Sequence, residues 1–380
     1  DMRNIVIACG GTGGHLTPGI ALAQNLEERG YPSWLFISQK AVDTRLSRKY
    51  PKLSFEAMPG APLIKSPLGM ARFGHGFLFS FLRSYRFYGK IGADAMVGFG
   101  GFSSFGPAMA ARARGIPVFI HEANRAVGKA VRFLAKRSTR LYLPEGMHLE
   151  GISPDVIRNV GYPLRKEFRR IPKERARKQL GISLSDRLLV VLGGSQGAVS
   201  LNRWVKDQLE PLAAEGISTY CLTGMNKESS GVVQLEGLGG QTVTNRFVSF
   251  TDEMNAVLSA ADLVISRAGA GAIAEIIRCR IPSILIPYPF AADNHQFLNA
   301  EFLERKGATI VCPEENMAGN LLNEVREVMF NEEFRTTLRR NLFALDNGDV
   351  ANRISDDISQ CLKKQALHDP VQGGILRMIG

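Results

Sequence analysis

The chain has 380 residues, too many for one ordinary domain and enough for two domains with separate cores. Hydrophobic residues make up 45% and charged residues 22%, which is a globular composition and excludes a disordered chain. The net charge of +11 lies in one half: residues 1–165 hold 22 Lys and Arg against 10 Asp and Glu, and residues 166–380 hold 25 against 26. We therefore expect the first half to meet an anionic partner, namely a membrane surface, a diphosphate or a nucleic acid.

Several other classes of protein are disfavoured. The five cysteines are scattered without a C-x-x-C pair, which indicates reduced thiols rather than a disulfide framework or a zinc site. A strand-like run begins at Ile5, so we expect no signal peptide. No apolar stretch approaches the roughly 20 residues that span a bilayer. A D-x-D motif is absent, which disfavours a transferase that holds its nucleotide through a carboxylate-bound metal.

The first predicted strand, residues 5–9, leads into a glycine-rich loop at 10–15 and a helical stretch at 19–29. This order opens nucleotide-binding α/β domains, because glycine lets backbone N–H groups and the helix N-terminus approach a phosphate. The loop is neither G-x-G-x-x-G nor a Walker loop, which argues against a plain dinucleotide site. A tight turn without a ligand is the alternative for this loop alone.

Residues 57–93 contain no Asp or Glu and predict an amphipathic helix. Large apolar residues recur there at helical spacing, with a stripe of cations beside them. This pattern is typical of a helix that lies on an anionic membrane, and a core helix with a solvated basic face explains it equally well. The membrane-facing candidates are Arg72, Phe77, Leu78, Phe81, Leu82, Arg83, Arg86 and Lys90.

Three apolar runs, at residues 34–37, 95–97 and 118–120, predict further strands of the first sheet. His121 and Glu122 follow the last run, at the carboxyl end where open α/β sheets bind ligands. A lone histidine is usually structural. Because His15 and His121 both follow strands, with Glu122 beside them, the sequence favours acid–base chemistry.

The order of strand, glycine loop and helix recurs one domain-length later. The second set is residues 188–192, 193–198 and 201–212, and further strands are predicted at 220–222, 263–265, 283–286 and 309–311. Helical stretches separate most of these runs, as in βαβ units. The sequence thus predicts an α/β protein of two tandem Rossmann-like domains with a cleft between them. We place the domains at 1–162 and 163–348, with the helical segment 349–364 a candidate to pack back on the first.

Two polar segments follow strands of the second domain. In RAGA, at 267–270, small residues would let a ligand lie against the helix start, and Glu275 lies about two turns into that helix, suited to the hydroxyls of a ribose. The alternative is a packed small-residue helix with Glu275 solvated. DNHQFLNA, at 293–300, gathers polar groups that suit a polyhydroxyl ligand, whereas an N-cap cluster around Asp293 explains only one or two of them.

Taken together, these motifs resemble those of the MurG family of bacterial glycosyltransferases over most of the chain. The matching segments are GGTGGH at 10–15, FGGFSSFGP at 99–107, HEAN at 121–124, GYPLR at 161–165, GGSQGA at 193–198, RAGA at 267–270 and DNHQFLNA at 293–300. The resemblance implies the two-domain GT-B fold. It also implies inverting transfer of N-acetylglucosamine from UDP-GlcNAc to the C4 hydroxyl of lipid-linked N-acetylmuramyl-peptide, the step from lipid I to lipid II in peptidoglycan synthesis.

The same resemblance implies where the enzyme works and with what. It implies a peripheral protein on the cytoplasmic face of the bacterial inner membrane. Its partners would be UDP-GlcNAc, an undecaprenyl-diphosphate-linked muramyl-peptide acceptor and the anionic membrane surface, with no nucleic acid. No cofactor would be required, and stimulation by a divalent cation is left open.

The resemblance also assigns roles to residues. His15 is the first choice of general base and Glu122 the second, Glu275 matches the ribose-binding carboxylate, and His295 and Gln296 match sugar-contacting positions. The donor-side positions are Thr12, Gly13, Gly14, Asn124, Arg165, Ser195, Gln196, Gly197, Thr251, Met254, Arg267, Gly269, Ala270, Glu275, His295 and Gln296. The acceptor-side positions are Gly101, Phe102, His121 and Asn124.

Three positions depart from the family pattern, and other functions stay open. Ala123 replaces a common Gln, Phe102 replaces a common Tyr, and Ala272 stands where a Thr often contacts phosphate. The alternatives are another GT-B enzyme, such as a UDP-sugar epimerase or a glycolipid synthase, and a non-catalytic nucleotide-sugar binding protein. A dinucleotide-dependent oxidoreductase is disfavoured because neither glycine loop fits its fingerprint.

Overall fold

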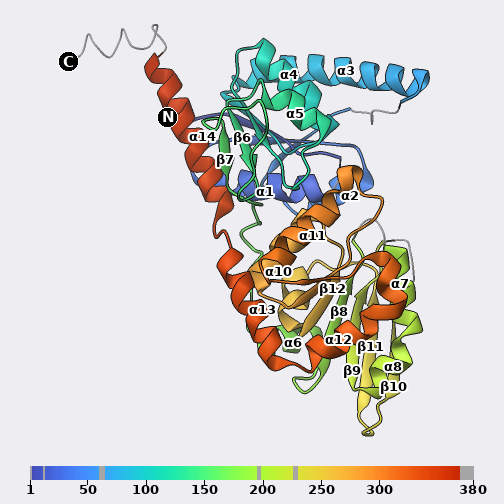
Figure 1. Ribbon diagram of the computed structural model, residues 1–380. Coiled ribbons are helices and arrows are strands. Elements are labelled where there is room, and N and C mark those ends of the chain that lie inside the picture. Colours follow the sequence, from blue (N-terminus) through green and yellow to red (C-terminus); the bar gives the residue numbers. More distant parts are fainter. Residues whose placement is uncertain (1, 12, 60–64, 195–197, 226–229, 369–380) are drawn as a thin grey trace, which may run out of the picture. The chain divides into compact units, whose positions relative to one another are not determined.

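The computed structural model describes residues 2–11, 13–59, 65–194, 198–225 and 230–368. The chain divides into two compact units, residues 1–166 with 347–380 (unit 1) and residues 167–346 (unit 2) (Figure 1). The division after Lys166 lies slightly beyond the joint placed after residue 162 from the sequence. Each unit is an α/β structure built on one seven-stranded sheet.

Unit 1 is built on a wholly parallel sheet. Its strands are β1 (Ile5–Ala8), β2 (Ser33–Ile37), β3 (Ser54–Ala57), β4 (Ala95–Gly98), β5 (Val118–His121), β6 (Arg140–Leu143) and β7 (Ile157–Asn159). They lie in the order β3-β2-β1-β4-β5-β6-β7. The order reverses between β1 and β4, and open α/β sheets bind ligands beyond the carboxyl ends of the strands at such a switch point.

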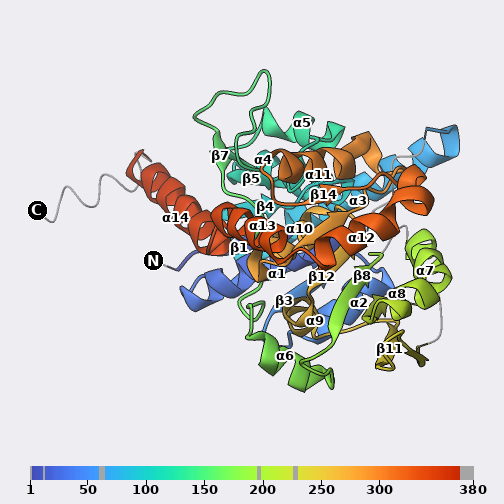
Figure 2. The ribbon, with the colours of Figure 1, turned by 60° about the horizontal axis from the view of Figure 1, so that its bottom comes forward.

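Helices cover both faces of this sheet, as Figures 1 and 2 show. They are α1 (Gly13–Glu28), α2 (Ala41–Arg48), α3 (Pro67–Ile91), α4 (Phe105–Ala113), α5 (Lys129–Ala135) and α14 (Val350–His368), with a 3-10 turn η1 (Phe102–Ser104). Apolar residues of α1 and α14 share a core with one face of the sheet, and those of α3, α4 and α5 share a core with the other. The last helix therefore belongs to unit 1, where Asp357 accepts a hydrogen bond from Tyr142 Oη at 2.7 Å.

Unit 2 has the same plan with one antiparallel edge. Its strands are β8 (Arg187–Leu192), β9 (Ile217–Leu222), β10 (Gly231–Glu236), β11 (Thr242–Val248), β12 (Leu263–Ser266), β13 (Ser283–Leu285) and β14 (Ile310–Val311). The order is β10-β11-β9-β8-β12-β13-β14, and only β10 runs antiparallel to its neighbour. The switch point lies between β8 and β12, the two strands that precede the second glycine loop and the RAGA segment.

The helices of unit 2 follow the strands. They are α6 (Lys173–Leu180), α7 (Ala198–Asp207), α8 (Leu209–Ala214), α9 (Met254–Ala260), α10 (Ala270–Cys279), α11 (His295–Arg305), α12 (Leu322–Met329) and α13 (Glu332–Leu345), with short turns η2 (Ala292–Asn294), η3 (Glu314–Asn316) and η4 (Met317–Leu321). The single helix predicted over 201–212 is wrong, because the chain breaks at Gln208 into α7 and α8.

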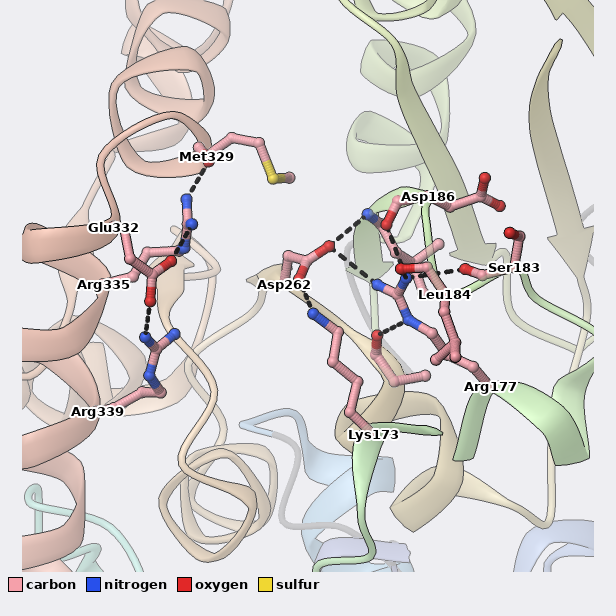
Figure 3. Close-up of polar contacts among 12 residues, drawn as sticks. Lys173, Arg177, Ser183, Leu184, Asp186, Asp262, Met329, Glu332, Arg335 and Arg339 are labelled. Atoms are coloured by element: carbon pink, nitrogen blue, oxygen red, sulfur yellow. Dashed lines mark hydrogen bonds and ion pairs between the residues drawn. The ribbon is translucent and has the colours of Figure 1, made fainter. Parts of the chain in front are cut away.

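A buried arginine, Arg177, joins the segments that precede β8 and β12 in unit 2 (Figure 3). Arg177 of α6 is fully buried, and its guanidinium donates to the backbone oxygens of Ala260 and Asp186 at 3.0 and 2.7 Å. It also donates to Asp262 Oδ2 at 3.0 Å, and that carboxylate accepts the backbone N–H of Leu188 at 2.8 Å. A buried charge is tolerated when it is paired and hydrogen-bonded in this way. The network fixes the starts of β8 and β12, whose other ends carry the candidate site.

Candidate active site

The first glycine loop turns sharply between β1 and α1 in unit 1. A Cβ atom at Gly10 would lie 2.5 Å from Ser38 N, so a side chain there would clash with the backbone that follows β2. Gly100 and Gly101, after β4, have φ angles of 70° and 73°, the left-handed region that favours glycine. Both loops lie at the switch point of the sheet. Gly13 and Gly14 open α1, and Thr12 lies outside the described residues.

A buried carboxylate holds the first glycine loop. Asp43 of α2 is completely buried, and its Oδ2 accepts the backbone N–H of Gly11 at 3.1 Å. The same oxygen accepts Ser38 N at 2.9 Å and Ser38 Oγ at 2.6 Å. The loop after β1 and the end of β2 are thus tied to one side chain. Asp43 stands in an ordinary amphipathic helix, so the sequence contains no motif that points to it.

Tyrosine and serine hydroxyls hold the same loop from other elements. Ser103 Oγ donates to Gly10 O at 2.8 Å. Tyr162 Oη donates to Gly14 O at 3.2 Å and lies 2.9 Å from Thr17 Oγ1. The resemblance pointed to the GYPLR segment but assigned a role only to its arginine. In the structure, its tyrosine positions the start of α1.

His15 and Glu122 both lie close to Gly100 in the loop after β4. A Cβ atom at Gly100 would lie 3.8 Å from His15 Nε2 and 3.6 Å from Glu122 Oε2. A Cβ atom at Gly101 would lie 3.2 Å from His15 Cε1. Glu122 is 8% exposed and accepts the backbone N–H of Ala123 at 3.1 Å. The structure thus brings together the two residues that the sequence proposed for acid–base work.

His121 is engaged by the protein itself. Its side chain is 2% exposed, and its Nε2 lies 2.7 Å from Gly161 O. Since a carbonyl oxygen can only accept, Nε2 carries the proton. Burial lowers the pKa of His121 to about 4, the bond to Gly161 opposes the shift, and nearby His15 adds to it. His121 is therefore neutral at pH 7 and anchors Gly161.

A pocket of about 510 Å³ opens beside the loops that follow β1 and β4. It lies entirely within unit 1 and is here called the loop pocket. Its lining residues are Gly10, Gly11, His15, Phe36, Ile37, Ser38, Gln39, Lys40, Met58, Pro59, Gly101, Phe102 and Ser103. Sites for small molecules commonly have volumes of about 300–1,000 Å³.

Two other predicted site residues also lie in unit 1. Asn124 is half-buried in the segment after β5, and Arg165 Nη1 donates to Tyr50 Oη at 2.7 Å.

Helix α3 presents an unusual distribution of side chains. Ser66 caps it by accepting Gly69 N at 3.0 Å, and it ends at Gly92, which has a φ of 62°. Several of its buried positions are small residues, Gly76, Ser80 and Ser84, and a Cβ atom at Gly106 of α4 would lie 2.7 Å from Ser80 Oγ, so the two helices pack closely. The exposed apolar residues of the helix are Leu68, Met70, Leu78, Phe79, Leu82 and Tyr85.

The apolar residues of α3 that were expected to face a membrane are not all exposed in the structure. Phe77 and Phe81 are partly buried, and the ring of Phe77 lies 5.3 Å from that of Phe105. They are thus directed toward α4, while Leu78 and Leu82 are exposed as expected and Phe79 joins them. Arg72, Arg83, Arg86 and Lys90 are exposed, and Arg83 lies 3.8 Å from Glu56 in an ion pair.

In unit 2, Arg267 is buried in a network of protein groups. It follows β12 and is 3% exposed. Its Nη2 donates to Glu314 Oε1 at 2.6 Å and to Ser200 Oγ at 3.1 Å, and its Nη1 donates to Ile286 O at 3.2 Å. Burial acts to raise the pKa of Glu314, but the hydrogen bonds from Ser200 and Arg267 outweigh it and hold that pKa below its usual range. The arginine thus fixes the segments after β12 and β13.

The start of α11 holds the same two segments. Gln296 Oε1 accepts the backbone N–H of Ala268 at 3.0 Å and of Tyr288 at 2.9 Å. Asn299 Nδ2 donates to Ala268 O at 3.1 Å. Two of the polar groups read from the DNHQFLNA segment therefore position backbone. His295 Nδ1 lies 2.8 Å from Ala292 O.

The remaining donor-side positions are distributed around the switch point of unit 2. Gly269 precedes α10, and a Cβ atom built there would have no described atom within 4 Å, so the approach to the helix start is open. Ala270 begins this helix and Glu275 is half-buried in its second turn. Thr251 Oγ1 accepts Glu253 N at 3.0 Å just before Met254 begins α9. Ser195, Gln196 and Gly197 lie outside the described residues.

Within the described ranges, no group of three or more His, Cys, Asp and Glu side chains is placed to hold a metal ion. Across the same part of the chain, no helix is both long enough and apolar enough to span a bilayer.

Known proteins match this chain along nearly its whole length. Residues 5–143 match the glycosyltransferase family 28 N-terminal domain, and residues 188–354 match the C-terminal domain of that family. The UDP-N-acetylglucosamine--N-acetylmuramyl-(pentapeptide) pyrophosphoryl-undecaprenol N-acetylglucosamine transferase of Opitutus terrae is 45% identical over 365 residues, which cover 94% of this chain and 95% of the relative. A protein of the same name from Geobacter sp. (strain M21) is 33% identical, with 92% and 94% covered.

A solved structure agrees on the architecture. The crystal structure of Acinetobacter baumannii MurG matches 95% of this chain and 100% of its own, with a TM-score of 0.69 and 22% sequence identity. At that identity the match shows the fold, which is the GT-B arrangement of two parallel-sheet α/β domains. The chain therefore belongs to glycosyltransferase family 28 and, within it, to the MurG family of N-acetylglucosamine transferases.

Proposed function

We propose that the protein is an inverting glycosyltransferase that moves N-acetylglucosamine from UDP-GlcNAc to the C4 hydroxyl of a lipid-linked N-acetylmuramyl-peptide. The observation that carries the proposal is the 45% identity, along 94% of the chain, to a relative whose name states this donor and acceptor. The geometry supports it, because each unit places a glycine-rich loop and polar side chains at the switch point of its sheet.

The donor is assigned to unit 2. The open start of α10, at Gly269 and Ala270, would meet the diphosphate with backbone N–H groups and the positive end of the helix. Glu275, one turn further, would accept the ribose hydroxyls. Gln296 would face the sugar with its amide nitrogen, since its oxygen already accepts two backbone N–H groups.

Inversion at C1 implies a direct displacement, in which one bond forms as the other breaks. The C4 oxygen of the acceptor forms a bond to C1 of N-acetylglucosamine while the bond from C1 to the diphosphate oxygen breaks. The electron pair leaves with UDP, and amides at the helix start would stabilise that charge, so we expect no requirement for a cofactor. The hydroxyl proton passes to a base.

His15 is our choice for this base, and Glu122 is the second. His15 lines the loop pocket and lies next to Gly100 and Gly101. Glu122 is nearly buried but close to the same glycine. His121 is unsuited, because its Nε2 proton is held by Gly161 and its pKa of about 4 makes it a weak base.

The exposed face of α3 would bring the enzyme to its acceptor at the membrane. Large apolar side chains and cations share that face, as in helices that lie in the interface of an anionic bilayer. The lipid-linked acceptor keeps its sugar near the bilayer surface. We therefore place the protein peripherally on the cytoplasmic face of the bacterial inner membrane, with that surface and no nucleic acid as its anionic partner.

Product analysis tests the proposed reaction. UDP-GlcNAc with a radiolabelled sugar is incubated with the lipid-linked muramyl acceptor, and the lipid phase is extracted and analysed. We expect label in a lipid-linked disaccharide with a β-1,4 bond. Conversion of UDP-GlcNAc alone into another UDP-sugar would instead favour an epimerase, and binding without any conversion would favour a non-catalytic binding protein.

A further inference from the structure

The wall of the loop pocket has two chemically different parts. The glycine loop forms one part together with Lys40, whose Nζ donates to Gly11 O at 2.9 Å. An ammonium group carries three donors and suits phosphate oxygens, whereas the backbone N–H of Gly11 is already donated to Asp43. The other part is apolar and consists of Phe36, Ile37, Met58, Pro59 and Phe102.

The apolar part continues out of the pocket toward α3. Phe102 is 39% exposed, and its ring lies edge-on to that of Phe73, with centroids 5.6 Å apart and planes at 86°. Phe73 belongs to α3, whose exposed side chains include Met70 and Leu78. Apolar groups therefore lead from the pocket to Phe73 of α3, all within unit 1.

A pocket with this composition fits an amphiphile whose anionic head is joined directly to a hydrocarbon chain. A free sugar has no hydrocarbon group that would fill the apolar part. In the proposed reaction, the acceptor carries a diphosphate joined directly to a polyprenyl chain. We propose that Met58, Pro59 and Phe102 bind the first carbons of that chain, so that the enzyme recognises the lipid as well as the sugar. This inference rests on the proposed function.

Soluble acceptors test the inference without a membrane. Muramyl-peptide diphosphates carrying either a geranyl chain or a methyl group are compared as acceptors, with UDP release as the readout. Burying several carbons of the geranyl chain should raise kcat/KM at least about tenfold over the methyl acceptor, mainly through KM. If the wild-type enzyme uses both acceptors equally well, the inference is wrong.

Two serine substitutions of matched exposure assign the preference to the pocket. Phe102→Ser should reduce the geranyl-to-methyl ratio to about twofold or less. Phe133→Ser is the control, because Phe133 is also 39% exposed in unit 1 but packs on Phe105 of α4 and does not line the pocket. Each ratio compares two acceptors on one protein sample, so partial loss of folded enzyme cancels.

The outcomes separate this inference from the proposed function. A wild-type ratio in Phe102→Ser, or an equal loss in Phe133→Ser, would contradict binding of the lipid by the pocket wall. Failure of the proposed function would look different. It would give no UDP release with either soluble acceptor or with the membrane-borne one.

Discussion

Glu275 stands half-buried in the second turn of α10, near the open start of that helix. If it accepts the ribose hydroxyls of the donor, Glu275→Ala should weaken binding of UDP-GlcNAc by about 2–3 kcal/mol, the value of a charge-assisted hydrogen-bonding pair. Calorimetry measures this directly. Glu301→Ala, which removes another half-buried helix glutamate of unit 2, is the control. Unchanged affinity in Glu275→Ala would remove the ribose assignment.

His15 is the group we expect to take the proton of the acceptor. His15→Ala should lower kcat by about a hundredfold to ten-thousandfold while donor affinity changes little, as for loss of a general base. His148→Ala removes an exposed histidine of unit 1 and serves as the control. Steady-state kinetics with saturating acceptor give the comparison. Near-normal turnover of His15→Ala would transfer the role to Glu122 or to water.

His121 links stability to pH. Its pKa is about 4 in the folded protein and near 6.5 when unfolded, so the unfolded state binds the proton more tightly. The stabilisation is complete above pH 6.5 and is lost as the pH falls toward 4. The loss amounts to about 3 kcal/mol. We expect His121→Gln, which can still donate to Gly161, to lack this part of the pH dependence in denaturant titrations. A difference between the two proteins that stays constant from pH 6.5 to 4 would contradict the assignment.

At the scale of elements, α3 shows what a sequence pattern determines and what it leaves open. The spacing of apolar residues predicted the helix, and the capping by Ser66 and Gly92 is local. The pattern could not say which of the large apolar residues are buried, because they extend around more than one side of the helix. Small residues at 76, 80 and 84 decide it, since they allow α4 to approach closely and leave the larger Leu78 and Phe79 exposed.

Charge reversal on α3 tests its membrane role. Each cation near an anionic surface contributes about 1 kcal/mol, so Arg86→Glu with Lys90→Glu should weaken liposome binding by more than about tenfold. Arg83 is left unchanged because it pairs with Glu56. Lys363→Glu with Lys364→Glu, on α14 against the other face of the sheet, is the matched control. Equal binding of both double variants to anionic vesicles in sedimentation would show that the α3 cations are only solvated.

The central strands were predictable from the sequence, because a strand buried on both faces is a continuous apolar run, such as Ile5–Ala8 or Leu188–Leu192. The edge strands β3 and β10 were not, because they have exposed or half-buried positions and no such run. The short edge strand β14 lies within the predicted run 309–311. The motifs follow strands at the switch points of both sheets, but some residues that position these loops were missed. Asp43 binds the first glycine loop from a helix with no motif, and Glu314 reaches Arg267 from a distant turn.

For the whole molecule, the central claim is that this protein transfers N-acetylglucosamine from UDP-GlcNAc to the lipid-linked muramyl acceptor. The most direct measurement is UDP release from UDP-GlcNAc with and without the lipid-linked muramyl acceptor, coupled to quantification of the disaccharide product. We predict that UDP appears only with the acceptor, in a one-to-one ratio with the lipid-linked disaccharide. Release at the same rate without acceptor, or acceptor-dependent release without that disaccharide, would contradict the account.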